Sequence, residues 1–406
     1  MIYHLVRPVA RYVLRYYYRN IDLTGLEHIP PDAAVVLAAN HPTAFIEPCV
    51  LACFQPRTLW FLARGNLFRN RFFSALLDAV HILPVFRLED GGYGKLKDNY
   101  ATFAACHRAL SRRRAIMILA EGRCIHERAL RPLRKGTARL ALGALDGDPT
   151  LPEVYVVPVG CNFTDATRPR SGVLIRCGAP LLASTYLADY RRNEAATIRR
   201  FTADLRERLS PLVVQFPDGA TAAARETRLA ADRADHPAPA GVTHDGRQLT
   251  RELALAAAPL PDPGRWSALG NEAFESGLPL AARPARAQAP PPARATWLRA
   301  GLALLLQLPQ LPLWALAAYF RDKPKHIEFA GPVHFATVAG GTFLLYPLAL
   351  VLLPWWAKLW LAAALLTVRP CLRWWEALRH ARAARRWSQR MRGHPDAVLR
   401  RSFSRG

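Results

Sequence analysis

The sequence AVVLAANHPTAFIEP, residues 34–48, decides how this chain folds and what it does. An apolar run over 34–39 ends at Asn40 and His41, and Glu47 follows six positions after the histidine. A short apolar run of this kind is typical of a buried strand, so His41 is expected at a strand end. An imidazole whose tautomer is fixed by a neighbouring carboxylate is suited to act as a general base. The pair alone also fits an accidental meeting of His and Glu, and the rest of the chain has to decide.

Outward from this stretch, short apolar runs alternate with amphipathic stretches from Ile21 to about residue 215. The apolar runs predict strands over 34–39, 58–63, 81–85, 115–120, 154–162 and 173–177. The amphipathic stretches predict helices that include 68–80, 96–111 and 134–145. Strands alternating with helices indicate an α/β domain.

Two further predicted strands end in residues suited to binding an anion. Arg64 and Gly65 follow the strand over 58–63 and precede a predicted helix, whose N-terminal amides could bind phosphate beside a guanidinium. Glu121, Gly122 and Arg123 follow the strand over 115–120. Glycine lets the backbone approach a ligand closely, and Arg123 supplies a second guanidinium.

Two more stretches continue the pattern. Lys135 and Gly136 belong to a basic turn, RPLRKGT over 131–137, just before a predicted helix. Pro158 lies in VVPVG over 156–160, which reads as a buried strand closed by glycine. Each stretch is a weak signal singly, and their order along the chain strengthens them.

Taken in order, these stretches resemble the phospholipid and glycerol acyltransferase superfamily over residues 21–180. The segments NHPTAFIEP, FLARGNLF, LAEG and VVPVG stand where that family has its four motifs. Two departures are present, because Glu47 replaces the usual Asp and Leu119-Ala120 replaces the usual Phe-Pro before Glu-Gly. The resemblance implies an acyltransferase-like α/β domain with a mixed, mostly parallel sheet flanked by helices.

The resemblance also implies an activity. A fatty acyl group would move from acyl-CoA or acyl-carrier protein to a hydroxyl of glycerol-3-phosphate, with dihydroxyacetone phosphate as a further acceptor, in phospholipid biosynthesis. His41, held by Glu47, would be the base, and no cofactor or metal is expected besides the thioester co-substrate. Glu121 would orient the acceptor or support the basic residues. The implied substrate-binding residues are Arg64, Gly65, Glu121, Gly122, Arg123, Lys135, Gly136 and Pro158.

Alternatives stay open at this point. The acceptor could instead be 1-acylglycerol-3-phosphate (lysophosphatidate) or another lysolipid. A reading of another class is a non-catalytic, membrane-tethered scaffold that binds anionic lipid or nucleic acid, favoured by the departures at Glu47 and Leu119-Ala120. A metal site built from His41, Glu47, His81 and Glu121 is weaker, because no two of these share a ligand-like local spacing. The seven Cys are scattered and indicate neither zinc nor a disulfide framework.

The net charge points to an anionic partner. The chain has 406 residues, with 55 Lys and Arg against 31 Asp and Glu, which gives +24. A soluble nucleic-acid binder has no need for the long apolar segments after Trp297, so an anionic lipid membrane is favoured and nucleic acid is not expected. This length also exceeds one ordinary soluble domain.

Five regions are predicted. Residues 1–20 form a basic and aromatic amphipathic helix, either interfacial or packed on the next domain, and 21–215 form the acyltransferase domain. Residues 216–296, rich in Ala, Pro and Arg, are expected to be a mobile linker with some helix. A membrane region over 297–370 and a basic cytosolic tail over 371–406 follow.

The membrane region contains the apolar segments 297–320, 333–353 and 355–368. Pro309 and Pro312 are expected to kink the first segment or make it re-entrant. The tail from Leu372 has ten Arg, and the positive-inside tendency puts it in the cytosol with the catalytic domain. The sequence therefore predicts two crossings, with 355–368 lying in the interface or completing a broken second helix. The expected location is the cytoplasmic face of a membrane, a bacterial inner membrane.

Overall fold

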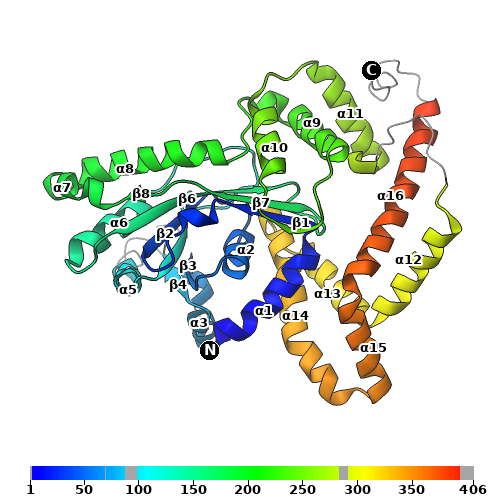
Figure 1. Ribbon diagram of the computed structural model, residues 1–406, viewed down its shortest axis with the longest axis horizontal. Coiled ribbons are helices and arrows are strands. Elements are labelled where there is room, and N and C mark those ends of the chain that lie inside the picture. Colours follow the sequence, from blue (N-terminus) through cyan, green and yellow to red (C-terminus); the bar gives the residue numbers. More distant parts are fainter. Residues whose placement is uncertain (1, 69, 87–97, 283–290, 394–406) are drawn as a thin grey trace. The chain divides into compact units, whose positions relative to one another are not determined.

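The chain divides into two compact units in the computed structural model (Figure 1). The structure describes residues 2–68, 70–86, 98–282 and 291–393. The first unit spans Met1–Val214, Gly241–Gly246 and Pro324–Phe335, and the second spans Gln215–Ala240, Arg247–Lys323 and Ala336–Gly406. All predicted catalytic and binding residues lie in the first unit.

The first unit is built on a nine-stranded sheet within the described residues, in the order β4-β3-β5-β2-β6-β7-β1-β9, with β8 also on β6. The strands are β1 (Asn20–Thr24), β2 (Ala34–Ala39), β3 (Leu59–Arg64), β4 (Ile82–Val85), β5 (Ala115–Leu119), β6 (Val154–Phe163), β7 (Gly172–Cys177), β8 (Leu181–Leu182) and β9 (Gly241–Thr243). Strands β4, β3, β5, β2 and β6 are parallel neighbours, whereas β7 is antiparallel to β6. This confirms the predicted mixed, mostly parallel sheet and its six predicted strands.

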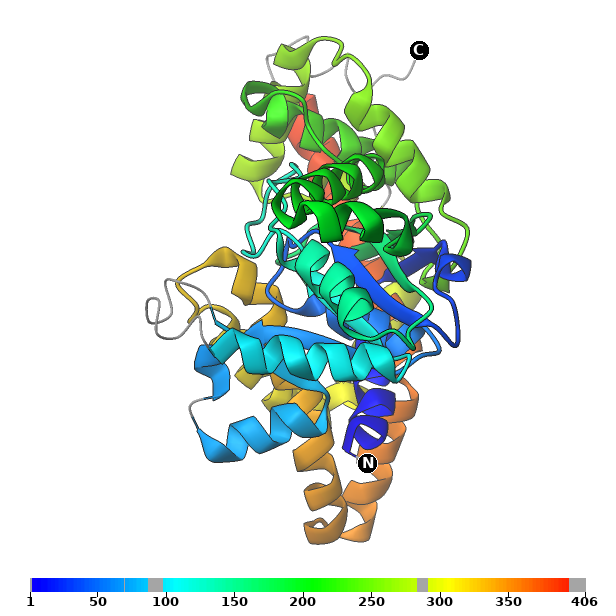
Figure 2. The same cartoon turned by 90° about the vertical axis from the view of Figure 1, so that its left-hand side faces the viewer.

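Helices cover both faces of this sheet. Those of the first unit are α1 (Ile2–Tyr17), α2 (Ile46–Phe54), α3 (Arg71–Ala79), α5 (Asp98–Ser111), α6 (Gly136–Gly147), α7 (Ser184–Arg192) and α8 (Glu194–Leu209). In Figure 2, α5, α6 and α8 pack side by side over one face. Ala34, Val36 and Ala38 of β2 share an apolar core with these three helices. Val35 and Leu37 alternate to the other face, where α2 lies (Figure 1), and are equally buried.

Helix α1 packs on the first unit through one face. Tyr3, Val13, Leu14 and Tyr17 are buried along it, and α1 contacts α2. This agrees with the predicted alternative of a helix packed on the following domain. Leu5 on the outer face is 56% exposed, so attachment of that face to a membrane surface stays a prediction.

The expectation of a mobile linker over 216–296 is wrong for much of that stretch. It contains α9 (Ala222–Asp235), α10 (Arg247–Ala257) and α11 (Pro263–Ser276), and β9 pairs in parallel with β1. A buried ion pair joins α9 to α10, because Arg233 Nη2 lies 2.7 Å from the buried Glu252 Oε2. Ala, Arg and Glu are strong helix formers, and their abundance indicated helix more than disorder. Residues 283–290 of the predicted linker lie outside the described residues.

Five apolar or basic helices follow in the part of the chain that the structure describes. They are α12 (Arg294–Gln307), α13 (Leu311–Arg321), α14 (Ala330–Leu352), α15 (Trp355–Leu366) and α16 (Val368–Gly393). Two continuous stretches, Arg294–Arg321 and Ile327–Leu352, are long and apolar enough to cross a bilayer. A 3-10 turn over Leu308–Gln310 separates α12 from α13, which agrees with the break expected at the prolines. The predicted basic tail begins inside α16, and its residues 394–406 lie outside the described residues.

Candidate active site

Three parallel strands bring the predicted residues to one edge of the sheet. Strands β2, β5 and β3 are neighbours in this order and end at Ala39, Leu119 and Arg64. His41 and Glu121 each follow two positions after their strand. The backbone N–H of His41 donates a hydrogen bond of 2.7 Å to Glu121 Oε2, so two motifs separated by 80 positions meet directly.

The side chain of Asn40 continues the sheet where β2 ends. Its Nδ2 donates to the carbonyl oxygen of Cys161 at 3.0 Å, and the Cys161 N–H donates to Asn40 Oδ1 at 2.7 Å. These two bonds continue the contact between β2 and β6 by one side chain beyond the end of β2. They fix the backbone just before His41. The sequence interpretation gave Asn40 no role, although a polar residue directly after a buried strand was a signal for one.

Glu47 holds the loop that carries His41. Its Oε1 accepts from the Thr43 N–H at 2.7 Å and its Oε2 accepts from the Thr43 hydroxyl at 2.7 Å. The same hydroxyl accepts from the Ile46 N–H at 3.2 Å, at the start of α2. Thr43 and Glu47 are both fully buried, so these bonds lie out of water. The loop between His41 and Glu47 is therefore tied to the carboxylate itself.

The His41 imidazole lies beside this carboxylate without a hydrogen bond to it. His41 Nδ1 is 3.8 Å from Glu47 Oε1, and Nδ1 is buried with no hydrogen-bond partner among the residues that the structure describes. Only 6% of His41 is exposed. A negative charge at this distance favours a proton on Nδ1, which leaves Nε2 to accept a proton from a substrate. The Glu47 carboxylate thus bonds to Thr43 and at the same time lies 3.8 Å from the imidazole, close enough for an electrostatic interaction.

Arg131 joins the second carboxylate to the rest of the site. Its backbone N–H donates to Glu121 Oε1 at 2.8 Å and its Nη2 donates to Glu121 Oε2 at 2.7 Å. Arg206 of α8 in turn donates to the Arg131 carbonyl at 2.7 Å and to the Leu130 carbonyl at 2.9 Å. The buried Glu121 side chain therefore binds both the His41 backbone N–H and Arg131, and it fixes these two residues relative to each other. Arg131 was part of a quoted basic turn but was not predicted as a site residue.

Gly122 turns the chain from β5 into a basic loop. Its φ of +74° is in the left-handed region, and a Cβ there would lie 2.9 Å from Arg134 Cγ. The Arg134 N–H donates to the Ala120 carbonyl at 2.7 Å, which keeps the far end of this loop at the end of β5. Lys135 precedes α6 and Gly136 begins it. The loop therefore places a lysine beside a helix N-terminus, which favours an anion.

Exposed cations surround this edge of the sheet. Arg123, Arg134 and Lys135 are exposed on the basic loop, and Arg64 is exposed at the end of β3. Gly65 is buried next to the Phe86 ring. A Cβ at this position would lie 2.1 Å from that ring, so a larger residue would not fit without a shift. These residues occupy the same edge as His41, and one strand, β5, lies between β3, which ends at Arg64, and β2, which precedes the histidine.

Pro158 lies within the sheet. It is buried in β6 opposite Ala38 of β2, and its carbonyl accepts from the Gly178 N–H at 2.8 Å. In this place it shapes the strand beside the site, one position before the residue paired with Ala39.

A buried thiol that interacts with both carboxylates, that of Cys161, is held in its neutral form. Burial, followed by the negative charges of Glu47, Cys177 and Glu121, raises the pKa of the Cys161 thiol well above its usual range. A neutral thiol is a poor nucleophile, so Cys161 is unsuited to covalent catalysis. Across the described part of the chain, no three His, Cys, Asp or Glu side chains gather in a group that could hold a metal ion.

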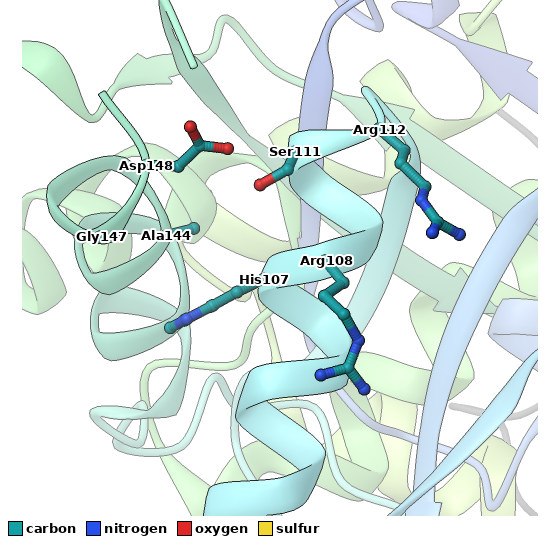
Figure 3. Close-up of a pocket in the computed structure, with 7 residues that line it drawn as sticks. All are labelled: His107, Arg108, Ser111, Arg112, Ala144, Gly147 and Asp148. Atoms are coloured by element: carbon teal, nitrogen blue, oxygen red, sulfur yellow. The ribbon is translucent and has the colours of Figure 1, made fainter. Parts of the chain in front are cut away.

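Two hollows formed by described residues of the first unit lie at the opposite edge of the sheet. Figure 3 shows one of about 340 Å³ between the ends of α5 and α6, lined by His107, Arg108, Ser111, Arg112, Ala144, Gly147 and Asp148. Both helix ends lead into the amino ends of strands, away from His41. The arginines in Figure 3 point away from Asp148, so no acid and base converge there. A second hollow of about 480 Å³ lies at the same edge and is lined by residues including Arg57 and Arg112.

Comparison with known proteins identifies the central part of the first unit. The family model described as Acyltransferase matches residues 20–162. A stretch of 127 residues, 31% of this chain, is 28% identical to glycerol-3-phosphate O-acyltransferase 2 of Saccharomyces cerevisiae. That stretch spans 17% of the yeast protein's length.

A solved structure gives a looser likeness. The 1-acyl-sn-glycerophosphate acyltransferase PlsC of Thermotoga maritima matches with a TM-score of 0.33 and 16% identity. The match covers 50% of this chain and 79% of PlsC.

Proposed function

Because residues 20–162 belong to the phospholipid and glycerol acyltransferase superfamily, we propose that this chain transfers a fatty acyl group from a thioester to glycerol-3-phosphate. The observation that carries the proposal is the His41 imidazole, 3.8 Å from the buried Glu47 carboxylate, on a loop pinned by Glu121. The donor would be acyl-CoA or acyl-carrier protein, and no other cofactor is part of the proposal.

The proposed step is direct acyl transfer. His41 Nε2 removes the proton of an acceptor hydroxyl while the hydroxyl oxygen forms a bond to the thioester carbonyl carbon. The carbon–sulfur bond then breaks, and the proton passes from His41 to the departing sulfur. A positioned base of this kind contributes about 10²- to 10⁴-fold in rate. Glu47 stabilises the imidazolium that exists between the two proton transfers.

The basic loop would bind the acceptor's phosphate. Arg123 and Lys135 are exposed at the edge where His41 lies, and Lys135 immediately precedes the N-terminus of α6. Arg64 adds a guanidinium from β3. Charge-assisted bonds from guanidinium groups suit phosphate oxygens. Since Arg131 is held by Glu121, we assign it to support of the loop rather than to the acceptor.

Glycerol-3-phosphate is preferred as acceptor because the yeast relative bears that activity in its name. Dihydroxyacetone phosphate has the same phosphate and a hydroxyl, and is a further candidate. The proposed location is the cytoplasmic face of a membrane, such as a bacterial inner membrane. Two apolar stretches of spanning length and the arginines of α16 support it.

The test is an acceptor panel with protein purified in detergent. Glycerol-3-phosphate, dihydroxyacetone phosphate and 1-acylglycerol-3-phosphate are each supplied with acyl-CoA and with acyl-carrier protein. We expect the fastest transfer to glycerol-3-phosphate. Preference for 1-acylglycerol-3-phosphate would establish the lysolipid alternative. Absence of transfer to every acceptor, with salt-sensitive binding to anionic vesicles or DNA, would establish the scaffold alternative.

A further inference from the structure

A short segment far along the chain belongs to the acyltransferase unit. Pro324–Phe335 begins between the two apolar stretches and includes the start of the second, Ile327–Leu352, and it groups with residues 1–214. It contains a 3-10 turn over Ile327–Phe329 and the first turn of α14. Nothing in its sequence resembles an acyltransferase motif, so its place in this unit has to be explained by its contacts.

The first contact is with the catalytic loop. The Ala44 N–H donates a hydrogen bond of 3.3 Å to the Glu328 carbonyl. Ala44 lies between His41 and Glu47, in the loop that carries both. The other bonds to this loop come from its own Thr43 and Glu47, from Glu121, and from Ile125 and Arg131 of the basic loop, which donate to the His41 carbonyl at 3.3 Å and 3.4 Å. The Glu328 carbonyl therefore holds the loop from a separate part of the chain.

The second set of contacts fixes the segment itself. The buried Tyr17 hydroxyl donates to the Gly331 carbonyl at 3.0 Å, and the Tyr17 ring lies 5.4 Å from His334 and 5.7 Å from Phe335. A Cβ on Gly331 would lie only 2.3 Å from the Ala166 carbonyl oxygen. The backbone of Gly331 thus packs directly against the backbone of Ala166, and only glycine fits at position 331 without a shift. The segment cannot slide without moving Tyr17 or Ala166.

We infer that residues 324–335 are a positioning element of the transferase site, which holds the loop from His41 to Glu47 in its working geometry. The inference deepens the proposed function and rests on it. Its physical basis is that the imidazole and carboxylate lie 3.8 Å apart without a direct bond, so their alignment depends on the loop that carries them. A misplacement of about 1 Å in such a site can cost about 10²-fold in rate. Residues 324–335 would therefore contribute to catalysis, although they lie at the start of a stretch that is proposed as a membrane anchor.

The chain offers a matched pair of substitutions. Gly331→Ala and Gly340→Ala both add one methyl group to α14, the first in its first turn and the second in its interior, and neither change disfavours helix. The methyl group at 331 meets the Ala166 carbonyl, whereas nothing lies within 4 Å at 340. Tyr17→Phe is a milder second variant, because it removes only the hydroxyl that bonds to Gly331.

Two readouts separate this inference from the proposed function. The first is the measurement of kcat and KM for the full-length protein. We expect Gly331→Ala to lower kcat about 10-fold or more with KM changed little, and Gly340→Ala to leave both unchanged.

The second is carbethoxylation of His41 by diethyl pyrocarbonate, followed by mass spectrometry of the peptide that contains His41. This measurement does not require an active enzyme. The 6% exposure of His41 predicts slow modification, and Gly331→Ala should accelerate it.

The outcomes are distinct. Failure of the wild type to acylate any acceptor would defeat the proposed function, and the modification rate would still decide the positioning role. If Gly331→Ala does not fold, Tyr17→Phe is expected to lower kcat and speed His41 modification in the same direction by a smaller factor. Wild-type kcat and an unchanged modification rate in a folded Gly331→Ala or Tyr17→Phe protein would overturn the inference.

Discussion

The two edges of the parallel sheet are both rich in arginine, and only one of them is built as a site. At the amino edge, Arg57 donates to the carbonyls of Pro30, Ala33 and Arg113, so its guanidinium is used to tie loops together. At the carboxyl edge, two buried carboxylates bind backbone N–H groups and keep His41 in place. Buried carboxylates therefore distinguish the edge with the candidate site more clearly than arginines do.

The largest effect should come from breaking the buried carboxylate that joins two motifs. Glu121→Gln removes the buried carboxylate 2.7 Å from Arg131 Nη2 and leaves the guanidinium with the exposed Glu127, whose Oε1 is 3.5 Å from Nε. Loss of one member of a buried pair costs about 3–5 kcal/mol. We expect the free energy of unfolding of the first unit to fall by this order, as measured by urea denaturation in detergent. Asp148→Asn at the amino edge is the control and should lower it much less, because the bonds of this carboxylate to Thr150 are local and solvent-exposed. An equal loss in the free energy of unfolding for the two substitutions would contradict the view that the buried carboxylates stabilise the carboxyl edge specifically.

Shortening or neutralising the second carboxylate should affect the rate more than the fold. Glu47→Gln keeps the length but removes the charge 3.8 Å from His41 Nδ1, and we expect kcat to fall about 10- to 100-fold. Glu47→Asp restores the residue usual in the superfamily but withdraws the carboxylate from Thr43. We expect Glu47→Asp also to lower kcat. A gain in kcat for Glu47→Asp would mean that Thr43 has no part in orienting this loop.

A smaller effect, confined to substrate affinity, should separate the arginines of the two edges. Arg123→Ala removes an exposed cation beside His41, and a lost charge-assisted bond of about 1.5–3 kcal/mol predicts a KM for glycerol-3-phosphate raised about 10-fold or more. Arg112→Ala removes a cation from the amino-edge hollows and should leave KM unchanged. Initial rates over a range of acceptor concentration provide the measurement. A raised KM in Arg112→Ala alone would move the phosphate site to the other edge.

The smallest effect concerns pH. Burial and the charge of Glu47 raise the pKa of Cys161 in the folded state above its usual value of 9.0. A group with a raised folded pKa gives stability that is fully present below the unfolded pKa and is lost as pH rises above it. We therefore expect the free energy of unfolding to decline above pH 9, with Cys161 contributing up to about 1.4 kcal/mol per pH unit. Urea titrations of Cys161→Ala between pH 7 and 10.5 should show a shallower decline. An identical slope would contradict the buried, neutral thiol.

Much of the catalytic unit could be predicted from sequence because its signals are local. Continuous apolar runs gave β2, β5 and β6, and the residues directly after β2 and β5 gave His41 and Glu121. Parallel strands place their carboxyl ends at one edge, so strand order was not needed to expect these residues together.

The parts that sequence did not reveal depend on contacts over long separations. Asn40 bonds to Cys161, Arg206 supports Arg131, and Ala44 bonds to Glu328, in each case across tens to hundreds of positions. Strand β9 was missed for the same reason, because three residues inside an Ala- and Pro-rich stretch carry too weak a pattern to predict pairing with β1.

The most direct test of the central claim compares a histidine at each edge. His41→Ala and His107→Ala are purified in detergent, their folding is checked by urea denaturation, and their rates of acyl transfer to glycerol-3-phosphate are measured at saturating donor. The account predicts that His41→Ala loses about 10²- to 10⁴-fold in kcat while His107→Ala retains the wild-type rate. Wild-type kcat in a folded His41→Ala protein would contradict it.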